Sequence, residues 1–365
     1  VQYLLKKNNV PVIQGTGRIT GRNEVTINHE QKVSGKYILI ATGSSPRIIP
    51  GFEFDESLIL SSNGALMLEK VPAKLLIIGG GAIGCEFAHI MNAFGVEVHL
   101  VEMLDHILPF EDRETAAALA DSFKRRGISV YAKTKVTSVA KKVSSVTAAI
   151  EGEGAQTRTL EVDKVLVVVG RTPNISGIGL EETGVKTEKG FISTGDYYKT
   201  SVENIFAIGD VVNSPLLAHV ASKEGEIAVE YMAGKKPVPR IDAAAIPAAV
   251  YTEPQVASFG LTEKKAEEAG INFKKAVFPY RGAGKSVAIE RSEGFVKIIY
   301  HGDTKEILGA HVVGVDATEI IHEILLAKTA ELLPEDIANM IHAHPTISEA
   351  VMESMRLAEG RAIHI

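Results

Sequence analysis

A glycine-rich turn constrains the fold of this chain more than any other feature of the sequence. Gly79-Gly80-Gly81-Ala82-Ile83-Gly84 follows a continuous apolar run at 74–78 and precedes a segment whose apolar side chains recur at helical spacing. Such an apolar run is typical of a strand buried on both faces of a parallel sheet. The pattern G-x-G-x-x-G between a strand and a helix is the turn that holds the pyrophosphate of a dinucleotide. A tight turn without a ligand is the alternative interpretation.

If the turn binds a dinucleotide, three of its glycines each have a physical role. Gly79 permits the sharp turn, Gly81 lets the backbone approach a pyrophosphate, and Gly84 lets the helix pack closely on the strand. The next strand, at 96–101, ends at Glu102, whose carboxylate can accept hydrogen bonds from ribose hydroxyls. A carboxylate at this place repels a 2′-phosphate, so we expect NAD rather than NADP.

The rest of the chain extends the α/β pattern. Apolar strands that alternate with helices predict a parallel sheet with right-handed crossovers, and from Asp242 onward the pattern changes to α+β. The expected strands lie at 10–13, 24–27, 36–40, 128–131, 165–169, 205–208, 295–300 and 307–313, a β-meander at 136–160, and helices at 112–126, 318–328 and 334–341.

Composition excludes several classes of protein. Of the 365 residues, 45% are hydrophobic, which excludes a wholly disordered chain, and the apolar runs are too short to span a bilayer. The net charge of −6 provides no basic field for nucleic acid. The single cysteine, Cys85, excludes an intrachain disulfide and a cysteine-rich metal site. The start at Val1 has no initiating Met and no signal peptide, so we expect a chain whose first segment is absent.

Two isolated polar residues allow two interpretations each. Asp210 follows Gly209 at a strand end, where its carboxylate suits either a cofactor hydroxyl or the N-cap of a helix. Cys85 stands at the start of the helix after Gly84, where the helix N-terminus can activate a thiol. We favour a small buried residue at this position.

A histidine-rich turn near the C-terminus carries the second chemical signal. Pro345 holds His344 in an extended backbone conformation, and Glu349 begins or precedes the last helix. If Glu349 folds back onto the imidazole, it selects the tautomer and makes His344 a general acid/base. His342 and His344 could instead bind a metal ion, although their spacing matches no zinc motif, and a surface turn is the third interpretation. We expect no metal and a structural His342.

Taken in order, the motifs resemble those of the flavin- and pyridine-nucleotide-dependent disulfide oxidoreductases, and most closely the members that oxidise dihydrolipoyl groups. The resemblance runs from about Gln14 to the C-terminus. It rests on Ile40-Ala41-Thr42-Gly43-Ser44, the glycine turn with Glu86, Val101-Glu102, Gly170-Arg171-Thr172-Pro173-Asn174, Ala207-Ile208-Gly209-Asp210, Leu216-Leu217-Ala218-His219 and His342-Ala343-His344-Pro345-Thr346.

The resemblance implies a role for each matching position. FAD would be contacted by Gly17, Thr42, Gly43, Ser44, Asp210, Leu216, Leu217, Ala218 and His219. NAD would be held by Gly79, Gly80, Gly81, Ala82, Ile83, Gly84, Glu86, Glu102, Val136 and Gly170. His344, oriented by Glu349, would be the acid/base in the active site of the other subunit of a homodimer.

The same resemblance implies an α/β fold in which a Rossmann-like NAD domain is inserted in a partial FAD domain, followed by an α+β dimerisation domain. The expected segments are 1–72 and 197–241 for the FAD domain, 73–196 for the NAD domain and 242–365 for the dimerisation domain. The expected partners are lipoyl domains or other subunits of 2-oxo-acid dehydrogenase or glycine cleavage systems, with no nucleic acid and no membrane. Bacterial cytoplasm is the first expected location, and the mitochondrial matrix is the second.

This sequence departs from the family pattern at the redox centre. The FAD fingerprint and the pair of redox cysteines belong before Val1, and Cys85 has no partner and lies at the NAD site. We therefore expect an oxidoreductase sequence that is inactive as this polypeptide alone. The alternatives are a catalytically incomplete NAD-binding dimeric fragment and a related flavin disulfide reductase.

Overall fold

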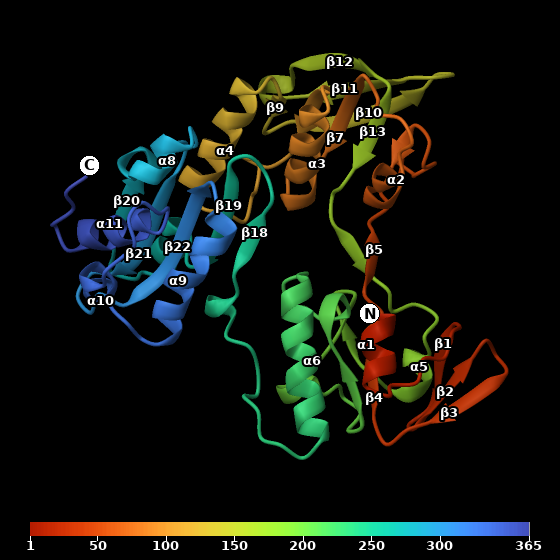
Figure 1. The fold of residues 1–365 in the computed structure, drawn as a ribbon. Coiled ribbons are helices and arrows are strands. Elements are labelled where there is room, and N and C mark those ends of the chain that lie inside the picture. The colour runs from red at the N-terminus through yellow and green to blue at the C-terminus, as the bar shows by residue number, and fades with distance from the viewer. Residues whose placement is uncertain (365) are drawn as a thin grey trace. The chain divides into compact units, whose positions relative to one another are not determined.

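The computed structural model describes residues 1–364 and divides the chain into two units (Figure 1). Unit 1 comprises Val1–Ser45 and Arg171–Ile241, and unit 2 comprises Pro46–Gly170 and the chain from Asp242 onward. Both contain helices and strands, which confirms the predicted α/β class. The finer division into four segments stays a prediction.

A five-stranded parallel sheet forms the centre of the first part of unit 2. Its strand order is β6-β13-β7-β8-β9, and every neighbouring pair is parallel. Leu75, Leu76 and Ile77 of β7 are fully buried, as expected for a central strand covered on both faces. The strands are β6 (Ile59–Leu60), β7 (Lys74–Ile78), β8 (Glu97–Val101), β9 (Ser129–Tyr131) and β13 (Lys164–Val167).

Different elements cover the two faces of this sheet. Side chains of α3 (Ala82–Ala93) and α4 (Arg113–Arg125) form a core with one face, and α2 (Ser62–Leu66) adds Ala65 to it. The meander of β10 (Lys135–Lys141), β11 (Val146–Glu151) and β12 (Thr157–Val162) packs on the other face. In β11 the side chains of Val146, Ala148 and Ile150 are buried, as the two-residue period of a strand requires.

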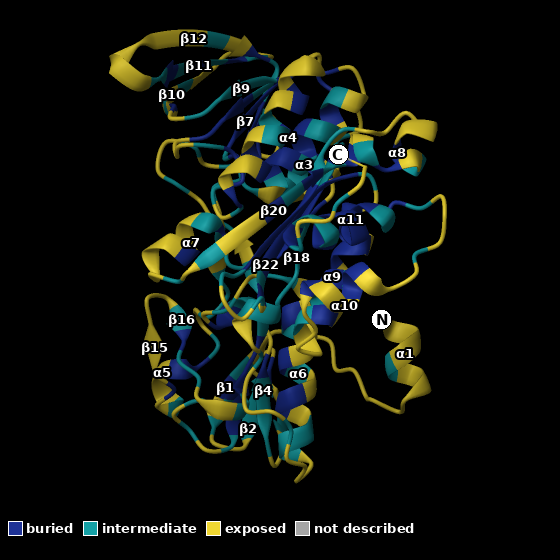
Figure 2. Cartoon of the chain, turned by 90° about the vertical axis from the view of Figure 1, so that its left-hand side faces the viewer, coloured by how far each residue is buried: buried dark blue, intermediate teal, exposed yellow. Residues whose placement is uncertain are grey.

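An antiparallel sheet with helices forms the second part of unit 2. Its order is β18-β19-β22-β21-β20, and its core includes side chains from α9, α10 and α11. Buried residues of the chain are coloured dark blue in Figure 2. Val250, Val256 and Val313 join the core of α3 and α4, so both parts of unit 2 share apolar contacts. The elements are β18 (Ala248–Val250), β19 (Gln255–Gly260), α7 (Glu263–Glu268), β20 (Phe273–Pro279), α8 (Gly284–Ala288), β21 (Phe295–His301), β22 (Ile307–Gly314), α9 (Ala317–Thr329), α10 (Pro334–Asn339) and α11 (Glu349–Ala358).

Unit 1 contains smaller sheets. β4 (Ile38–Ile40) and β17 (Ile205–Ala207) are parallel neighbours whose side chains contribute to two apolar clusters. The antiparallel meander is β1 (Gly17–Gly21), β2 (Glu24–Ile27) and β3 (Gln31–Ser34). The other elements are α1 (Gln2–Lys7), β5 (Ser44–Pro46, whose last residue belongs to unit 2) with β14 (Arg171–Pro173), α5 (Leu180–Thr183), β15 (Thr187–Glu188) with β16 (Phe191–Ile192), and α6 (Ala218–Met232).

One sequence-based expectation about strands is wrong, and several strands were not predicted. The expected strand at 10–13 is wrong, because these exposed residues have no ladder partner and Pro11 lacks an amide hydrogen. The sequence pattern also did not reveal β18, β19 and β20 of the antiparallel sheet.

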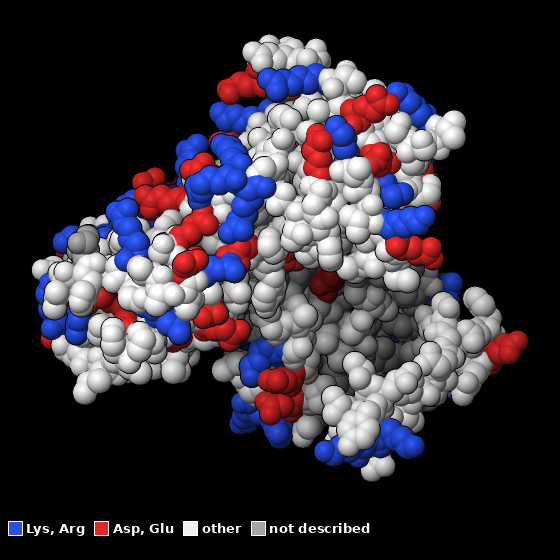
Figure 3. Space-filling view, turned by 45° about the horizontal axis from the view of Figure 1, so that its top comes forward, with Lys and Arg blue, Asp and Glu red and all other residues white. Residues whose placement is uncertain are grey.

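The surface carries charges of both signs, and acidic and basic side chains lie interspersed over the face seen in Figure 3. Among the residues that the structure describes, no helix has the length and apolar character that crossing a membrane requires.

Candidate functional site

The glycine turn has the close contacts expected of a dinucleotide-binding loop. Gly79 has a φ of +110°, and a Cβ added there would lie 2.5 Å from the Val168 carbonyl oxygen. A Cβ on Gly84 would lie 1.9 Å from the Gly79 carbonyl oxygen. Neither position admits a side chain, because the opposing atoms are backbone.

Gly81 differs from these two glycines, because nothing lies within 4 Å of the position of an added Cβ. Gly81 is also the N-cap residue of α3, and no side chain caps this helix end. The first N–H groups of a helix have no partner within the helix, and they carry a partial positive charge. The open backbone at Gly81 and the uncapped N-terminus therefore fit the pyrophosphate of NAD.

Glu102 connects this turn to the end of β8. Its Oε2 accepts the Gly80 N–H at 2.6 Å and its Oε1 accepts the Leu104 N–H at 2.8 Å. The residue is only 8% exposed. Each carboxylate oxygen can accept a further hydrogen bond, so a ribose hydroxyl can still bind there.

The remaining positions predicted for NAD lie on several elements of unit 2. Ala82 and Ile83 begin α3, whereas Val136 pairs with Ile150 in the meander. Gly170 has a φ of +114° and follows β13, the sheet neighbour of β7. Glu86 accepts the N–H of Tyr251 at 3.0 Å, a contact with the second part of unit 2 that the sequence did not indicate.

Cys85 is a buried residue of the α3 core, as favoured from the sequence. Its side chain is fully buried, and its Sγ donates to the Gly80 carbonyl oxygen. Burial, together with the nearby carboxylates of Glu102 and Glu86, raises the pKa of this thiol far above its ordinary value. The thiol is therefore not activated for nucleophilic chemistry.

In unit 1, the carboxyl ends of β4 and β17 bring a second set of predicted residues together. Ser44 donates its hydroxyl hydrogen to Asp210, and Arg171 donates to the Ser44 hydroxyl oxygen at 2.6 Å. Thr42 donates its hydroxyl to the Asn174 carbonyl oxygen at 2.7 Å. The carboxyl edge of parallel strands is where ligands bind in open α/β sheets, so this arrangement fits a cofactor.

The N-cap interpretation of Asp210 is wrong. Asp210 lies inside the short 3-10 turn Gly209–Val211, which has no side-chain cap, and the N-cap residue of α6 is Leu217. Ala218 and His219 are the first residues of α6, after Leu216, and Gly17 begins β1.

Glu224 is a residue of this region that the sequence did not reveal. It is fully buried on α6, and its Oε2 accepts the Gly209 N–H at 2.6 Å. Burial raises the pKa of this carboxyl group above its ordinary value. An acidic residue among the apolar positions of a helix was the only available signal.

The histidine turn has the geometry that an acid/base pair requires. His344 Nδ1 lies 2.9 Å from Glu349 Oε1, and the Thr346 N–H donates to Glu349 Oε2 at 2.8 Å. Although partial burial acts to raise the pKa of Glu349, these two hydrogen bonds hold it below its ordinary value. The His344 side chain is 74% exposed, so its Nε2 is accessible. The catalytic role of the pair stays a prediction.

His342 belongs to a different contact. Its Nε2 lies 2.7 Å from Glu323 Oε1, and its side chain is nearly buried. Because His342 and His344 bond to separate carboxylates, Glu323 and Glu349, the structure does not support a metal site shared by the two rings.

An ion cluster of Asp112, Glu114, Glu263 and Lys297 connects the two parts of unit 2, with Lys297 and Asp112 buried and Glu114 partly exposed. The three carboxylates lie close enough together to hold a cation, and the Lys297 ammonium group contacts all three. Burial works against the charge of Lys297, but the carboxylates hold its pKa above the ordinary value. The ammonium group thus takes the position that a cation would occupy.

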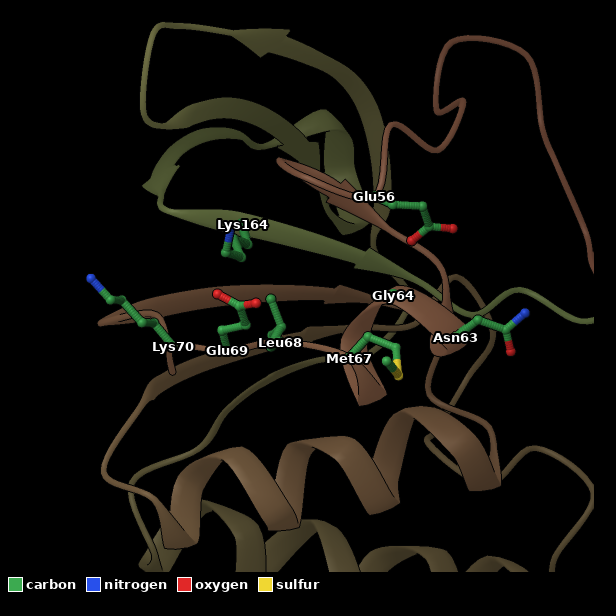
Figure 4. A pocket seen from close by; sticks show the side chains of 8 residues that line it. All are labelled: Glu56, Asn63, Gly64, Met67, Leu68, Glu69, Lys70 and Lys164. Atoms are coloured by element: carbon green, nitrogen blue, oxygen red, sulfur yellow. The ribbon is translucent and has the colours of Figure 1, made fainter.

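A shallow pocket lies between α2 and β13 in unit 2 (Figure 4). It is lined by Glu56, Asn63, Gly64, Met67, Leu68, Glu69, Lys70 and Lys164, none of which is a predicted site residue. A Cβ on Gly64 would lie 1.8 Å from the Glu56 carboxylate, so glycine is needed to keep Glu56 against α2.

Comparison with known proteins assigns the chain to a family. Residues 1–225 match the family described as pyridine nucleotide-disulphide oxidoreductase, and residues 246–355 match its dimerisation domain. The chain belongs to the pyridine nucleotide-disulphide oxidoreductase family, as its motifs predicted. FAD and NAD are the cofactors of this family, and the dimerisation domain supports a homodimer.

Within the family, the chain is similar to dihydrolipoyl dehydrogenases. It is 41% identical over 378 residues to that of Bacillus subtilis, a match that covers 100% of this chain and 79% of the relative. It is 39% identical over 371 residues to the mitochondrial enzyme of Pisum sativum, covering 100% and 74%. The crystal structure of LpdA from Mycobacterium tuberculosis matches with a TM-score of 0.89 at 28% identity, covering 98% of this chain and 79% of LpdA.

Proposed function

We propose that this chain serves the oxidation of dihydrolipoyl groups, with FAD and NAD as cofactors. The observation that carries the proposal is the 2.9 Å contact between His344 Nδ1 and Glu349 Oε1, in a chain similar over its whole length to dihydrolipoyl dehydrogenases. The net reaction converts a dihydrolipoyl dithiol and NAD⁺ into the lipoyl disulfide, NADH and a proton. Thiol protons must therefore be accepted close to the sulfur atoms.

His344 is the proposed proton acceptor. With Nδ1–H donated to Glu349, the neutral ring presents the lone pair of Nε2 to the exposed side of the turn. Because the thiolate rather than the thiol attacks a disulfide, a base at this place promotes thiol–disulfide exchange. In the proposed homodimer, His344 serves the active site of the other subunit.

The cofactor contacts follow the two loop regions. Gly79, Gly80, Gly81, Ala82, Ile83, Gly84, Glu86, Glu102, Val136 and Gly170 would hold NAD, and Gly17, Thr42, Gly43, Ser44, Asp210 and 216–219 would hold FAD. When bound, FAD would supply the acceptor for the electron pair of the dithiol, and NAD would supply the acceptor for a hydride. The uncapped start of α3 orients the pyrophosphate, and Glu102 selects the ribose without a 2′-phosphate.

The 365-residue polypeptide alone is proposed to be inactive with dihydrolipoamide. Its one cysteine, Cys85, is buried in the α3 core and cannot form a dithiol by itself. The redox dithiol on which His344 acts is therefore not supplied within this sequence.

The proposed partners are lipoyl domains or other subunits of 2-oxo-acid dehydrogenase or glycine cleavage systems. Relatives occur in a bacterium and in mitochondria, which supports bacterial cytoplasm as the first proposed location and mitochondrial matrix as the second.

Two preparations test the proposal: protein expressed from the native gene, and the 365-residue polypeptide of verified mass. Dihydrolipoamide-dependent reduction of NAD⁺ is expected from the first and not from the second. Turnover by the second would overturn the proposed inactivity. No turnover by the first, with flavin absorbance and NADH binding intact, would favour a related flavin disulfide reductase. A colourless preparation that binds NADH would favour the NAD-binding fragment.

A further inference from the structure

A buried carboxylate lies one helical turn beyond Glu349. Glu353, also on α11, is only 2% exposed. Its Oε2 accepts the backbone N–H groups of Ile363 at 3.0 Å and His364 at 3.3 Å. Its Oε1 accepts a hydrogen bond from Arg356 Nη1 at 2.8 Å. Because residues four apart on a helix share one face, Glu349 and Glu353 project from the same side of α11.

Residues 363–364, whose backbone N–H groups are bound by Glu353, pack against the segment 282–284, here called the glycine loop. A Cβ on Gly282 would lie 2.5 Å from the His364 carbonyl oxygen and 2.4 Å from Phe278 Cζ, so only glycine fits there. Two residues further on, a Cβ on Gly284 would lie 3.9 Å from His344 Cε1. The loop from Gly282 to Gly284 therefore runs from the C-terminal residues to the imidazole ring.

His344 thus has neighbours on two sides, and both lead back to α11. On one side, Glu349 contacts Nδ1 directly. On the other side, Glu353 holds residues 363–364, which lie on the glycine loop beside Cε1.

We propose that Glu353 is a positioning residue for His344. Glu353 binds the backbone of residues 363–364 and thereby holds the 282–284 loop beside the ring. Because the loop limits rotation of the ring, Nδ1 stays directed at Glu349. This inference rests on the proposed function only in taking His344 as the acid/base. Glu353 does not contact the reacting atoms, and its effect is on the tautomer and orientation of the imidazole.

The tautomer of His344 is the readout that a merely structural role of Glu353 would leave unchanged. In ¹⁵N-histidine-labelled full chain, two-bond ¹H–¹⁵N correlation spectra at alkaline pH show which ring nitrogen carries the proton. The His344 signals are assigned by their loss in His344→Gln. We expect the Nδ1–H form in the parent chain, because Glu349 accepts this hydrogen.

Two variants with matched controls test the inference. Glu353→Met removes both acceptor oxygens, and Ile363→Pro removes one donated N–H at a residue that is 72% exposed. Both should lose the preference for Nδ1–H. Ile363→Ala retains the N–H, and Glu359→Met removes a carboxylate that contacts Lys305 instead, so both should retain the preference. If Glu353→Met does not fold, Ile363→Pro with Ile363→Ala carries the test.

The inference is overturned if the folded variants Glu353→Met and Ile363→Pro keep the parent tautomer. The proposed function is tested separately by His344→Gln in protein from the native gene. Full turnover by that variant would contradict the acid/base role of His344 but would not contradict the positioning of its ring by Glu353. Failure of the proposed function and failure of this inference are therefore distinguishable.

Discussion

The ammonium nitrogen of Lys297 lies 2.7 Å from Oδ1 of Asp112, and no part of the Lys297 side chain is exposed to solvent. Asp112 immediately precedes α4 and Lys297 lies on β21, so the contact joins the two parts of unit 2. Glu114 and Glu263 also contact the ammonium group, and Lys275 pairs with both of these carboxylates. A buried charge held in this way is sensitive to the loss of either partner.

Replacing this lysine should destabilise the protein strongly. Lys297→Met leaves Asp112 buried without its cation, and we expect a loss of about 3–5 kcal/mol in the free energy of unfolding, measured by urea denaturation. Lys264→Met is the matched control, because Lys264 is exposed and contacts Glu268 at 3.8 Å. Its effect should stay within about 0.5 kcal/mol. Equal losses in the free energy of unfolding in the two variants would contradict the stabilising role assigned to Lys297.

Acid should weaken the same cluster. Burial acts to raise the pKa values of Asp112 and Glu114, but Lys297 holds both below their ordinary values. A carboxyl group whose pKa is depressed by folding stabilises the protein fully above its ordinary pKa, and that contribution is lost as the pH falls through the folded value. The urea concentration at the midpoint of unfolding should therefore decrease as the pH is lowered below about 4.5, which is the higher of the two ordinary pKa values. In Asp112→Asn the urea midpoint should decrease less steeply with falling pH. An unchanged slope would argue against the cluster as a source of this pH dependence.

Gly81 should be the glycine whose change affects binding more than folding. A Cβ at Gly81 meets no protein atom but enters the space proposed for the pyrophosphate. We expect Gly81→Ala to keep the urea midpoint and to raise the Kd for NADH about tenfold or more, equivalent to about 1.4 kcal/mol. Gly195→Ala, at an open glycine of unit 1, should leave the urea midpoint and the Kd for NADH unchanged. Fluorescence titration with NADH measures the difference.

Glu102 should control the choice between NADH and NADPH. Glu102→Gln keeps an acceptor for the Gly80 N–H but removes the negative charge that repels a 2′-phosphate. The ratio of the two dissociation constants should shift toward NADPH by about tenfold, equivalent to about 1.4 kcal/mol. Glu97→Gln, on the same strand with an exposed carboxylate, is the control. Equal shifts in both variants would rule out a specific contact.

The sequence was sufficient for those parts of the site that depend on local spacing. The glycine turn lies between a strand and a helix as predicted, because its glycines and the apolar run are contiguous. Glu349 reaches His344 because a short turn and the helix start determine that contact. Residues close in sequence have few ways to meet, so their pattern predicts their geometry.

Contacts between distant segments could not be predicted in this way. Lys297 stands in an apolar strand, which signals a buried charge, but its partners lie just before α4, on α4 and on α7. Glu353 likewise gave no sign that it holds residues beyond its helix. For Asp210 the sequence allowed two interpretations, and only the pairing of β4 with β17 brought Ser44 to its carboxylate.

The pairing of β4 with β17 has a consequence for biosynthesis. Ile38 lies beside Ile205, yet the segment Pro46–Gly170 is made between them and packs within the other unit. During translation, β4 must remain without its partner until β17 has left the ribosome, since contacts of high sequence separation form late. Its exposed edge during that interval is a point at which a nascent chain is open to aggregation and to binding by chaperones.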